Sequence, residues 1–374
     1  MKNKLIIFVL ILFNGVVIIQ SQEIRRDFRI PDIMGYHTMK GDFHMHTVFS
    51  DGKVWPDIRV IEAWQEGLDA IAITEHVEYL NELLPHDQNM SYEIAKKEGD
   101  KRGIIVIRGA EITRTLPEEC GHMNALFLND VTPLEQKDYL DAINEASNQG
   151  AFIFWNHPGW YGHQADTTIW FDVFTQLVNE NKMHGIEVAN WNRWFPEAFT
   201  WCIDKNLTVL ANSDIHNPTS FKYDYCKGDH RPVTILFTTE RTEEGMKDAL
   251  FNRRTVAYLK RGFYNQLMGK EEYLKALFFA SVEFELLSNT ENSLSFRIKN
   301  ISDLDFLLTK SNPDSRLNYR KQQFLYGRSE ESITISKTQP VKDDEIKIVY
   351  VIENLLKAPD RPVTIEIPVN KIVN

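Results

Sequence analysis

Short apolar runs recur between residues 40 and 260, each bounded by polar or turn-forming residues. They are Ala70–Ile73, Ile104–Ile107, Phe152–Phe154, Gly185–Val188, Thr208–Leu210 and Val233–Phe237. Their length and β-branched content favour buried strands over helices. Helical stretches lie between them: Pro56–Glu66, which begins with proline and precedes a glycine, Glu135–Gln149 and Glu243–Phe251. This alternation predicts an α/β fold with a parallel sheet, either open or closed into a barrel.

After residue 280 the pattern changes to alternating apolar and polar residues. The alternating segments are Ser281–Leu287, Ser293–Ile298, Ile333–Ile335, Ile346–Ile352 and Val363–Ile367. Such alternation predicts antiparallel strands with one buried face. We therefore expect the α/β domain over residues 35–262, a helical connection over 263–279 and a small antiparallel β domain over 280–374. The last part contains no histidine, so it is a poor candidate for chemistry.

The first residues have the three parts of a secretory signal peptide. Two lysines precede an apolar run from Leu5 to Ile19, and the small residue Ser21 stands at the expected cut. The run is shorter than the roughly 20 residues that a bilayer-spanning helix needs. We therefore predict a signal peptide over residues 1–21 and a periplasmic or secreted protein with no stable membrane anchor after cleavage. An uncleaved anchor is the alternative.

The charge balance and the cysteines exclude several classes of protein. Without the predicted signal peptide, 53 acidic residues face 40 lysines and arginines, a net charge of −13. Such a surface repels a polyanion, so nucleic acid is not an expected partner. The chain has three cysteines, Cys120, Cys202 and Cys226, which are too few and too scattered for a disulfide framework. The sequence contains no CxxC pair, so a zinc site with thiolate ligands is not expected.

Metal-type side chains follow the predicted strands. In the segment GDFHMHTVFSDG, His44 and His46 lie two residues apart, so an extended backbone places both imidazoles on one face. The other candidates at strand ends or strand starts are Asp51, His76, Glu111, His122, His157, Asp214 and His216. Since ligands gather at the carboxyl ends of the strands in such folds, we expect these side chains to cluster. His86, His163, His184 and His230 are histidines that lack this setting.

The motifs HMHTVFSDG, TEH, GAEIT, GHMNAL, NHPGW and NSDIH occur in the order and spacing of the PHP (polymerase and histidinol phosphatase) superfamily. Residues 40–260 therefore resemble a PHP domain. Within the superfamily the chain is most similar to exported bacterial Sb-PDE-like phosphodiesterases, and GHMNAL also resembles the branch that contains a carbamate-hydrolysing enzyme. The resemblance implies a distorted (β/α)7 barrel with metal ions at its carboxyl mouth.

The resemblance also implies three divalent ions. Carried over, the ligands are His44, His46, Glu111 and Asp214 for the first ion, His122 and His157 with bridging Glu111 for the second, and Asp51, His76 and His216 for the third. A hydroxide held between two ions by Glu111 and Asp214 would be the nucleophile. Imidazole and carboxylate ligands suit zinc, manganese or iron. Glu75 departs from the aspartate of many members, and we expect it to adjust the orientation of a ligand.

Substrate contacts have weaker signals. Arg114 lies three residues after Glu111 and is a candidate bidentate phosphate donor, although a surface salt bridge explains it equally well. Aromatic and imidazole side chains follow the ligand-bearing segments and are candidates for a pocket wall or for the core. They are Trp160, Tyr161, His163, Trp191 and Trp194.

We therefore predict an exported, metal-dependent phosphoesterase for small substrates, with diesters ahead of monoesters. The first alternative is hydrolysis of a carbamate, amide or carboxyl ester on the same metals. The second is a non-catalytic module that binds metal or a ligand, and it is disfavoured because all nine expected ligands are present.

Overall fold

The structure is a computed structural model that describes residues 24–113, 121–162, 168–262, 264–311, 314–342 and 345–367, with residues 369 and 372. The predicted signal peptide, Arg114 and His163 lie outside the described residues. No helix in the described part is long and apolar enough to cross a membrane.

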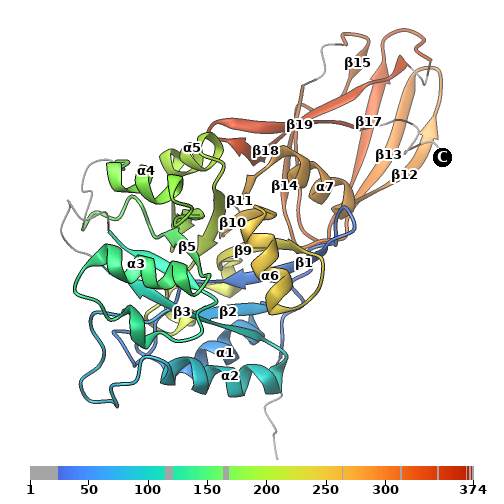
Figure 1. Ribbon diagram of the computed structural model, residues 1–374. Coiled ribbons are helices and arrows are strands. Elements are labelled where there is room, and N and C mark those ends of the chain that lie inside the picture. Colours follow the sequence, from blue (N-terminus) through green and yellow to red (C-terminus); the bar gives the residue numbers. More distant parts are fainter. Residues whose placement is uncertain are drawn as a thin grey trace, which may run out of the picture.

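A curved sheet forms the centre of the larger, N-terminal domain (Figure 1). Its strands are β1 (His37–Asp42), β2 (Ala70–Ile73), β3 (Ile105–Ile112), β4 (Met123–Leu126), β5 (Phe152–Trp155), β6 (Gly185–Asn190), β8 (Thr208–Asn212) and β9 (His230–Thr238). Most neighbours pair in parallel, but β4 is antiparallel to both of its neighbours and β9 is antiparallel to β1. Thr234 of β9 exchanges hydrogen bonds of 2.9 and 3.0 Å with the backbone of Ala211 in β8, which brings the two ends of the sheet together. The predicted distorted barrel is confirmed.

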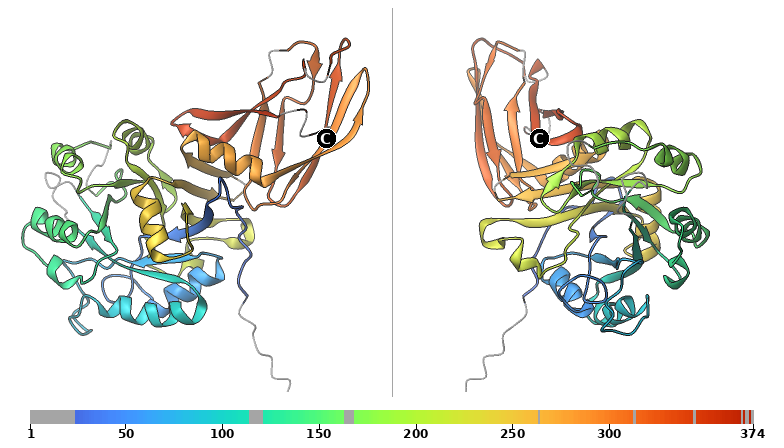
Figure 2. Two further views of the ribbon diagram at one scale, coloured as in Figure 1. Left: turned by 45° about the vertical axis from the view of Figure 1, so that its right-hand side comes forward. Right: turned by 90° about the vertical axis from the view of Figure 1, so that its left-hand side faces the viewer.

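Helices cover the outside of this barrel (Figures 1 and 2). They are α1 (Pro56–Gln65), α2 (Met90–Arg102), α3 (Tyr139–Asn148), α4 (Asp172–Asn179), α5 (Pro196–Asp204) and α6 (Glu243–Phe251). The predicted helices near α1 and α6 are present. Helix α3 begins later than predicted, because the Asp138 carboxylate accepts hydrogen bonds from the N–H groups of Leu140 and Asp141 and so caps its first turn.

The segment predicted as a helical connection over residues 263–279 is only partly helical. It begins with strand β11 (Tyr264–Gly269), which pairs antiparallel with β10 (Thr255–Arg261), and helix α7 covers Glu271–Ser281. Leu267 and Met268 are consecutive and fully buried, which suits a strand that is covered on both faces. Pairing with β10 therefore determines the structure of the first half of this segment.

The C-terminal part consists of two antiparallel sheets, which confirms the antiparallel β domain predicted there. One sheet contains β12 (Val282–Asn289), β13 (Ser293–Asn300), β17 (Glu330–Lys337) and β15 (Leu317–Asn318). The other contains β16 (Gln322–Leu325), β14 (Phe306–Lys310), β18 (Ile348–Ala358) and β19 (Arg361–Ile367). Strand β18 also pairs in parallel with β11 of the barrel, so this second sheet continues the barrel sheet.

Helix α7 packs between the barrel and the β domain (Figure 2). The ring of Tyr273 lies 5.0 Å from that of Phe237 in β9, and the ring of Phe278 lies 5.1 Å from that of Phe306 in β14. The two domains therefore share one continuous hydrophobic core. All nine predicted ligands lie before residue 217, on the barrel side of this core.

Candidate metal centre

The HxH segment lies just beyond the end of β1. Asp214 N–H donates to the His44 carbonyl at 2.9 Å, and His46 N–H donates to the Ile215 carbonyl at 3.1 Å, so this segment pairs with the chain that follows β8. Both imidazoles are fully buried, and their Nε2 atoms lie 3.3 and 3.1 Å from Oε2 of Glu111. The strand-like spacing therefore delivers both rings to one carboxylate, as the sequence predicted.

Glu111, near the end of β3, stands at the centre of the site. Its side chain is 1% exposed, and its two oxygens contact imidazole nitrogens of five histidines from four segments of the chain. These are His44, His46 and His76 on Oε2 at 3.3, 3.1 and 3.2 Å, and His122 and His157 on Oε1 at 2.8 and 3.6 Å. His122 directly precedes the antiparallel strand β4, and the start of an antiparallel strand lies at the same end of the barrel as the carboxyl ends of its parallel neighbours.

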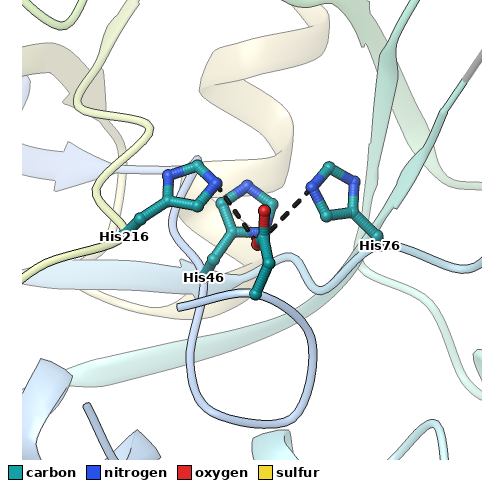
Figure 3. Close-up of side chains that lie close together, drawn as sticks. His46, His76 and His216 are labelled. Atoms are coloured by element: carbon teal, nitrogen blue, oxygen red, sulfur yellow. Dashed lines mark ion pairs between the residues drawn. The ribbon is translucent and has the colours of Figure 1, made fainter. Parts of the chain in front are cut away.

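A second carboxylate, Asp51, contacts an overlapping set of imidazoles, those of His46, His76 and His216, which Figure 3 labels. Its Oδ1 lies 3.2 Å from His216 Nε2, 3.6 Å from His76 Nε2 and 3.8 Å from His46 Nδ1. The ring of His46 stacks on the rings of His76 and His216, with centroids 4.4 and 4.3 Å away. His46 and His76 therefore each contact both carboxylates, Glu111 with one ring nitrogen and Asp51 with the other.

Asp214 completes the cluster from the loop that follows β8. Its Oδ1 lies 3.2 Å from His44 Nε2 and 3.3 Å from His46 Nε2, and its Oδ2 lies 3.9 Å from His157 Nε2. The backbone of Asp214 is left-handed, with φ of +50°, a conformation that Asp tolerates better than most residues. This turn directs the carboxylate at the histidines.

The donor set fits divalent cations. Three groups have ligand atoms close enough to share an ion: His46, Asp51, His76 and His216; His44, Glu111 and His157; and His44, His46 and Asp214. The Nε2 atom of His46 is buried and has no hydrogen-bond partner in the described part of the chain, although two carboxylate oxygens lie within 3.3 Å. A nitrogen that faces carboxylates without hydrogen bonding to them suits ligands arranged around a common cation. Nitrogen and oxygen donors without thiolate fit zinc, manganese or iron.

The electrostatics of the cluster also favour added positive charge. Burial alone would lower the pKa of His44, but the carboxylates of Asp214, Glu187 and Glu111 outweigh it and hold this pKa well above its usual value. Burial alone would raise the pKa of Glu111, but the imidazoles of His76, His44 and His122 hold it well below its usual range. The buried carboxylates thus require cationic neighbours, which a metal ion would provide.

Glu187 is a functional residue that the sequence reasoning missed. It lies fully buried in β6 and accepts hydrogen bonds at 2.9 Å from Nδ1 of His44, at 2.7 Å from the N–H of His157 and at 3.0 Å from Nδ2 of Asn212. By accepting from Nδ1, it leaves Nε2 of His44 as the ligand atom. The sequence could have indicated this role, since Glu187 lies within the predicted apolar strand Gly185–Val188 and a buried carboxylate requires hydrogen-bond partners.

Glu75 holds the loop that carries the first ligands. Its carboxylate accepts hydrogen bonds from the N–H of Thr47 at 3.1 Å and from the hydroxyls of Thr47 and Ser50. It contacts none of the ligand imidazoles of the described residues within 4 Å. Glu75 thus fixes the turn between His46 and Asp51, in keeping with the supporting role expected for it.

A cavity of about 390 Å³ opens over the cluster. Trp160, Tyr161 and Trp191 line it, as the sequence suggested, whereas Trp194 lines a neighbouring cavity. Arg193 and Lys222 also line the cavity and were missed, because neither lies next to a recognisable ligand motif. The cavity therefore joins an acidic, histidine-rich floor to a wall that carries aromatic and cationic side chains.

Replacement of Asp51 by asparagine should selectively weaken the ion held by the Asp51 group. The amide keeps the shape but loses the charge that faces His46, His76 and His216, whereas Glu111 and Asp214 are unchanged. We expect about one metal equivalent fewer per chain and a reduced, not abolished, hydrolytic rate. Elemental analysis of protein purified without chelator, paired with the rate on the same samples, measures this. Loss of all metal from Asp51→Asn would contradict it.

Comparisons with known proteins agree with this description. The PHP domain family matches residues 42–179, and an Ig-like domain family matches residues 281–368. A crystal structure from Bacteroides vulgatus, of a two-domain protein containing a predicted PHP-like metal-dependent phosphoesterase, is 44% identical with a TM-score of 0.87 and covers 92% of this chain and 98% of its own.

Two further proteins are more distant. An uncharacterized protein of Methanocaldococcus jannaschii is 31% identical over 194 residues, which are 48% of this chain and 83% of that protein. A putative metal-dependent phosphoesterase from Bifidobacterium adolescentis is 17% identical with a TM-score of 0.37, over 47% of this chain and 87% of its own.

Proposed function

Because the chain belongs to the PHP superfamily of metal-dependent hydrolases, we propose that it is a phosphoesterase that acts on small phosphodiesters at a site for three divalent ions. The observation that carries this proposal is the buried Glu111 carboxylate in contact with five imidazoles, two of which, His46 and His76, also face the second carboxylate, Asp51. The domain composition of the Bacteroides vulgatus relative supports the same chemistry.

The metal ions, the carboxylates and water would have different roles in this reaction. Bound divalent ions supply Lewis-acid polarisation of a phosphoryl oxygen and lower the pKa of water. Glu111 and Asp214 both contact Nε2 of His44, while Glu187 orients the same ring through its Nδ1 atom. The described cavity lining contains no serine or cysteine that would act as a nucleophile, so water is the expected attacking group.

Activity and metal content test this function together. Protein purified without chelator should contain zinc, manganese or iron and should hydrolyse bis-p-nitrophenyl phosphate faster than p-nitrophenyl phosphate. A p-nitrophenyl carboxyl ester serves as the control for the alternative hydrolase chemistry. Chelation should abolish phosphodiester hydrolysis, and the metal should restore it. Hydrolysis of the carboxyl ester alone would replace the phosphoesterase proposal with an esterase.

We further propose that the mature chain begins near Gln22 and is exported. The support is the charged start, the short apolar run and the small residue at position 21. Intact-mass analysis of protein from the native compartment should show the loss of residues 1–21. A membrane-bound product that keeps these residues would contradict export with cleavage.

A further inference from the structure

One wall of the metal cavity presents a tryptophan in a rare backbone conformation. Trp191 has φ of +56° and is 40% exposed, a left-handed backbone that a large side chain seldom adopts. The tight turn between β6 and β7 (Arg193–Trp194) holds it, because Asn190 pairs with Arg193 and the N–H of Trp191 donates to the Asn212 carbonyl at 3.1 Å. A turn residue exposed to this extent contributes little to the core, so the fold does not account for the indole ring.

Two cationic side chains, Lys222 and Arg193, line the same cavity as this ring. The ammonium of Lys222 lies 4.8 Å from the centre of the Trp191 ring, and the guanidinium of Arg193 lies 5.6 Å from the centre of the Phe195 ring. Among the described residues, neither cation has a carboxylate within 4 Å, although the chain is strongly acidic. The carboxylates on the floor of the cavity are matched by imidazoles instead. Lys222 and Arg193 are therefore available to pair with an anion that enters the cavity.

We propose that Trp191, Lys222 and Arg193 form a subsite for a planar aromatic group that carries a second negative charge, on the side of the substrate away from the scissile phosphoester. This proposal rests on the proposed function, since it assumes that the metal floor takes the phosphoryl group. Indole supplies a flat face for a ring, and the two cations neutralise an anion at its edge. The cavity volume of about 390 Å³ accommodates such a two-part substrate.

A graded set of phosphonates tests the subsite. Methylphosphonate, phenylphosphonate and 4-phosphonobenzoate share the group for the metal floor and add first a ring and then a carboxylate. Isothermal titration calorimetry on metal-loaded protein should show each addition tightening binding by about tenfold, the order expected for one stacking contact and one ion pair. This readout needs no turnover.

Substitutions of single residues show which side chain causes each increase in affinity. Lys222→Gln should reduce the advantage of the carboxylate, since only Arg193 then remains to pair with it, and should leave the other two affinities unchanged. Trp191→Ala should remove the advantage of the ring, and Trp191→Gly should do the same while relieving the left-handed backbone. The matched control is Lys205→Gln, because Lys205 lies 4.4 Å over the ring of Trp170 outside the cavity lining. It should change none of the three affinities.

Equal affinities for the three phosphonates, or a uniform loss in Lys222→Gln, would overturn the subsite. Hydrolysis of bis-p-nitrophenyl phosphate by the same preparations separates the two proposals. Graded binding without hydrolysis would support the subsite and count against the phosphoesterase. Hydrolysis with equal affinities would support the phosphoesterase and remove the subsite.

Discussion

Glu111→Gln should remove at least one bound ion per chain and lower the phosphodiesterase rate by roughly 10³-fold or more, beyond the 10–100-fold expected when a partner of a ligand is lost. The substitution keeps the shape of the side chain and deletes the one charge that faces five imidazoles. Its Oε1 also accepts a hydrogen bond from Asn156 at 2.9 Å, which an amide nitrogen in that position cannot do. The lost charge and the lost hydrogen bond therefore both affect the buried carboxylate at the centre of the site.

Glu187→Gln is the matched control for this prediction. Glu187 is as buried as Glu111 and contacts His44 from the opposite ring nitrogen, but it lies behind the ligand and not among the ligands. It should retain metal and lose activity by roughly 10–100-fold. Elemental analysis and steady-state rates on both variants decide the matter. Full metal content with near-normal turnover in Glu111→Gln would rule out a shared central carboxylate.

Arg231→Met should cause the largest loss of stability among single substitutions of the barrel. Arg231 is fully buried in β9 and pairs with Glu66, the residue that follows α1, at 2.5 and 2.9 Å, and with Asp42 of β1 at 3.1 Å. Removing the guanidinium leaves two buried carboxylates without their cation. We expect a loss of about 3–5 kcal/mol in the free energy of unfolding, measured by urea denaturation.

The pH dependence of this loss identifies its cause. Burial would raise the pKa of Glu66, but Arg231 outweighs burial and lowers it, so ionised Glu66 stabilises the wild type above its unfolded pKa, and this contribution is lost as the pH falls through the folded pKa. Without Arg231, burial raises the pKa, so folding favours the protonated acid and stability is lost as the pH rises. The deficit of Arg231→Met should therefore be larger at about pH 8 than at about pH 5.

Arg231→Met with Glu66→Gln is the control, because it removes one of the two stranded charges. It should recover part of the stability and weaken the pH dependence. A loss under about 1 kcal/mol in the single variant would mean that water reaches these carboxylates and solvates them. Asp42 also accepts hydrogen bonds from the backbone and hydroxyl of Ser213, next to Asp214. The same variants should therefore also weaken metal retention.

The sequence was most informative where chemistry and strand position coincide. His44 and His46 were predictable because two histidines at strand spacing face one way, and Glu111 was predictable because it follows a buried apolar run. Lys222 and Arg193 were not, since their role depends on the fold bringing them into the same cavity as Trp191. Strand β11 was misread as helix because its partner β10 and its other neighbour β18 decide its structure, and the pairing with β18 joins distant parts of the chain.

That pairing has a consequence for how the protein is made. Strand β11 is synthesised before β18, so until β18 pairs with it the barrel ends in an open edge with unpaired N–H and C=O groups. Such an edge is a template for pairing with another chain. The β domain supplies β18 to cover it, with Leu355 and Leu356 opposite Leu267 and Met268. The β domain thus closes an edge at which two barrels could otherwise pair with each other.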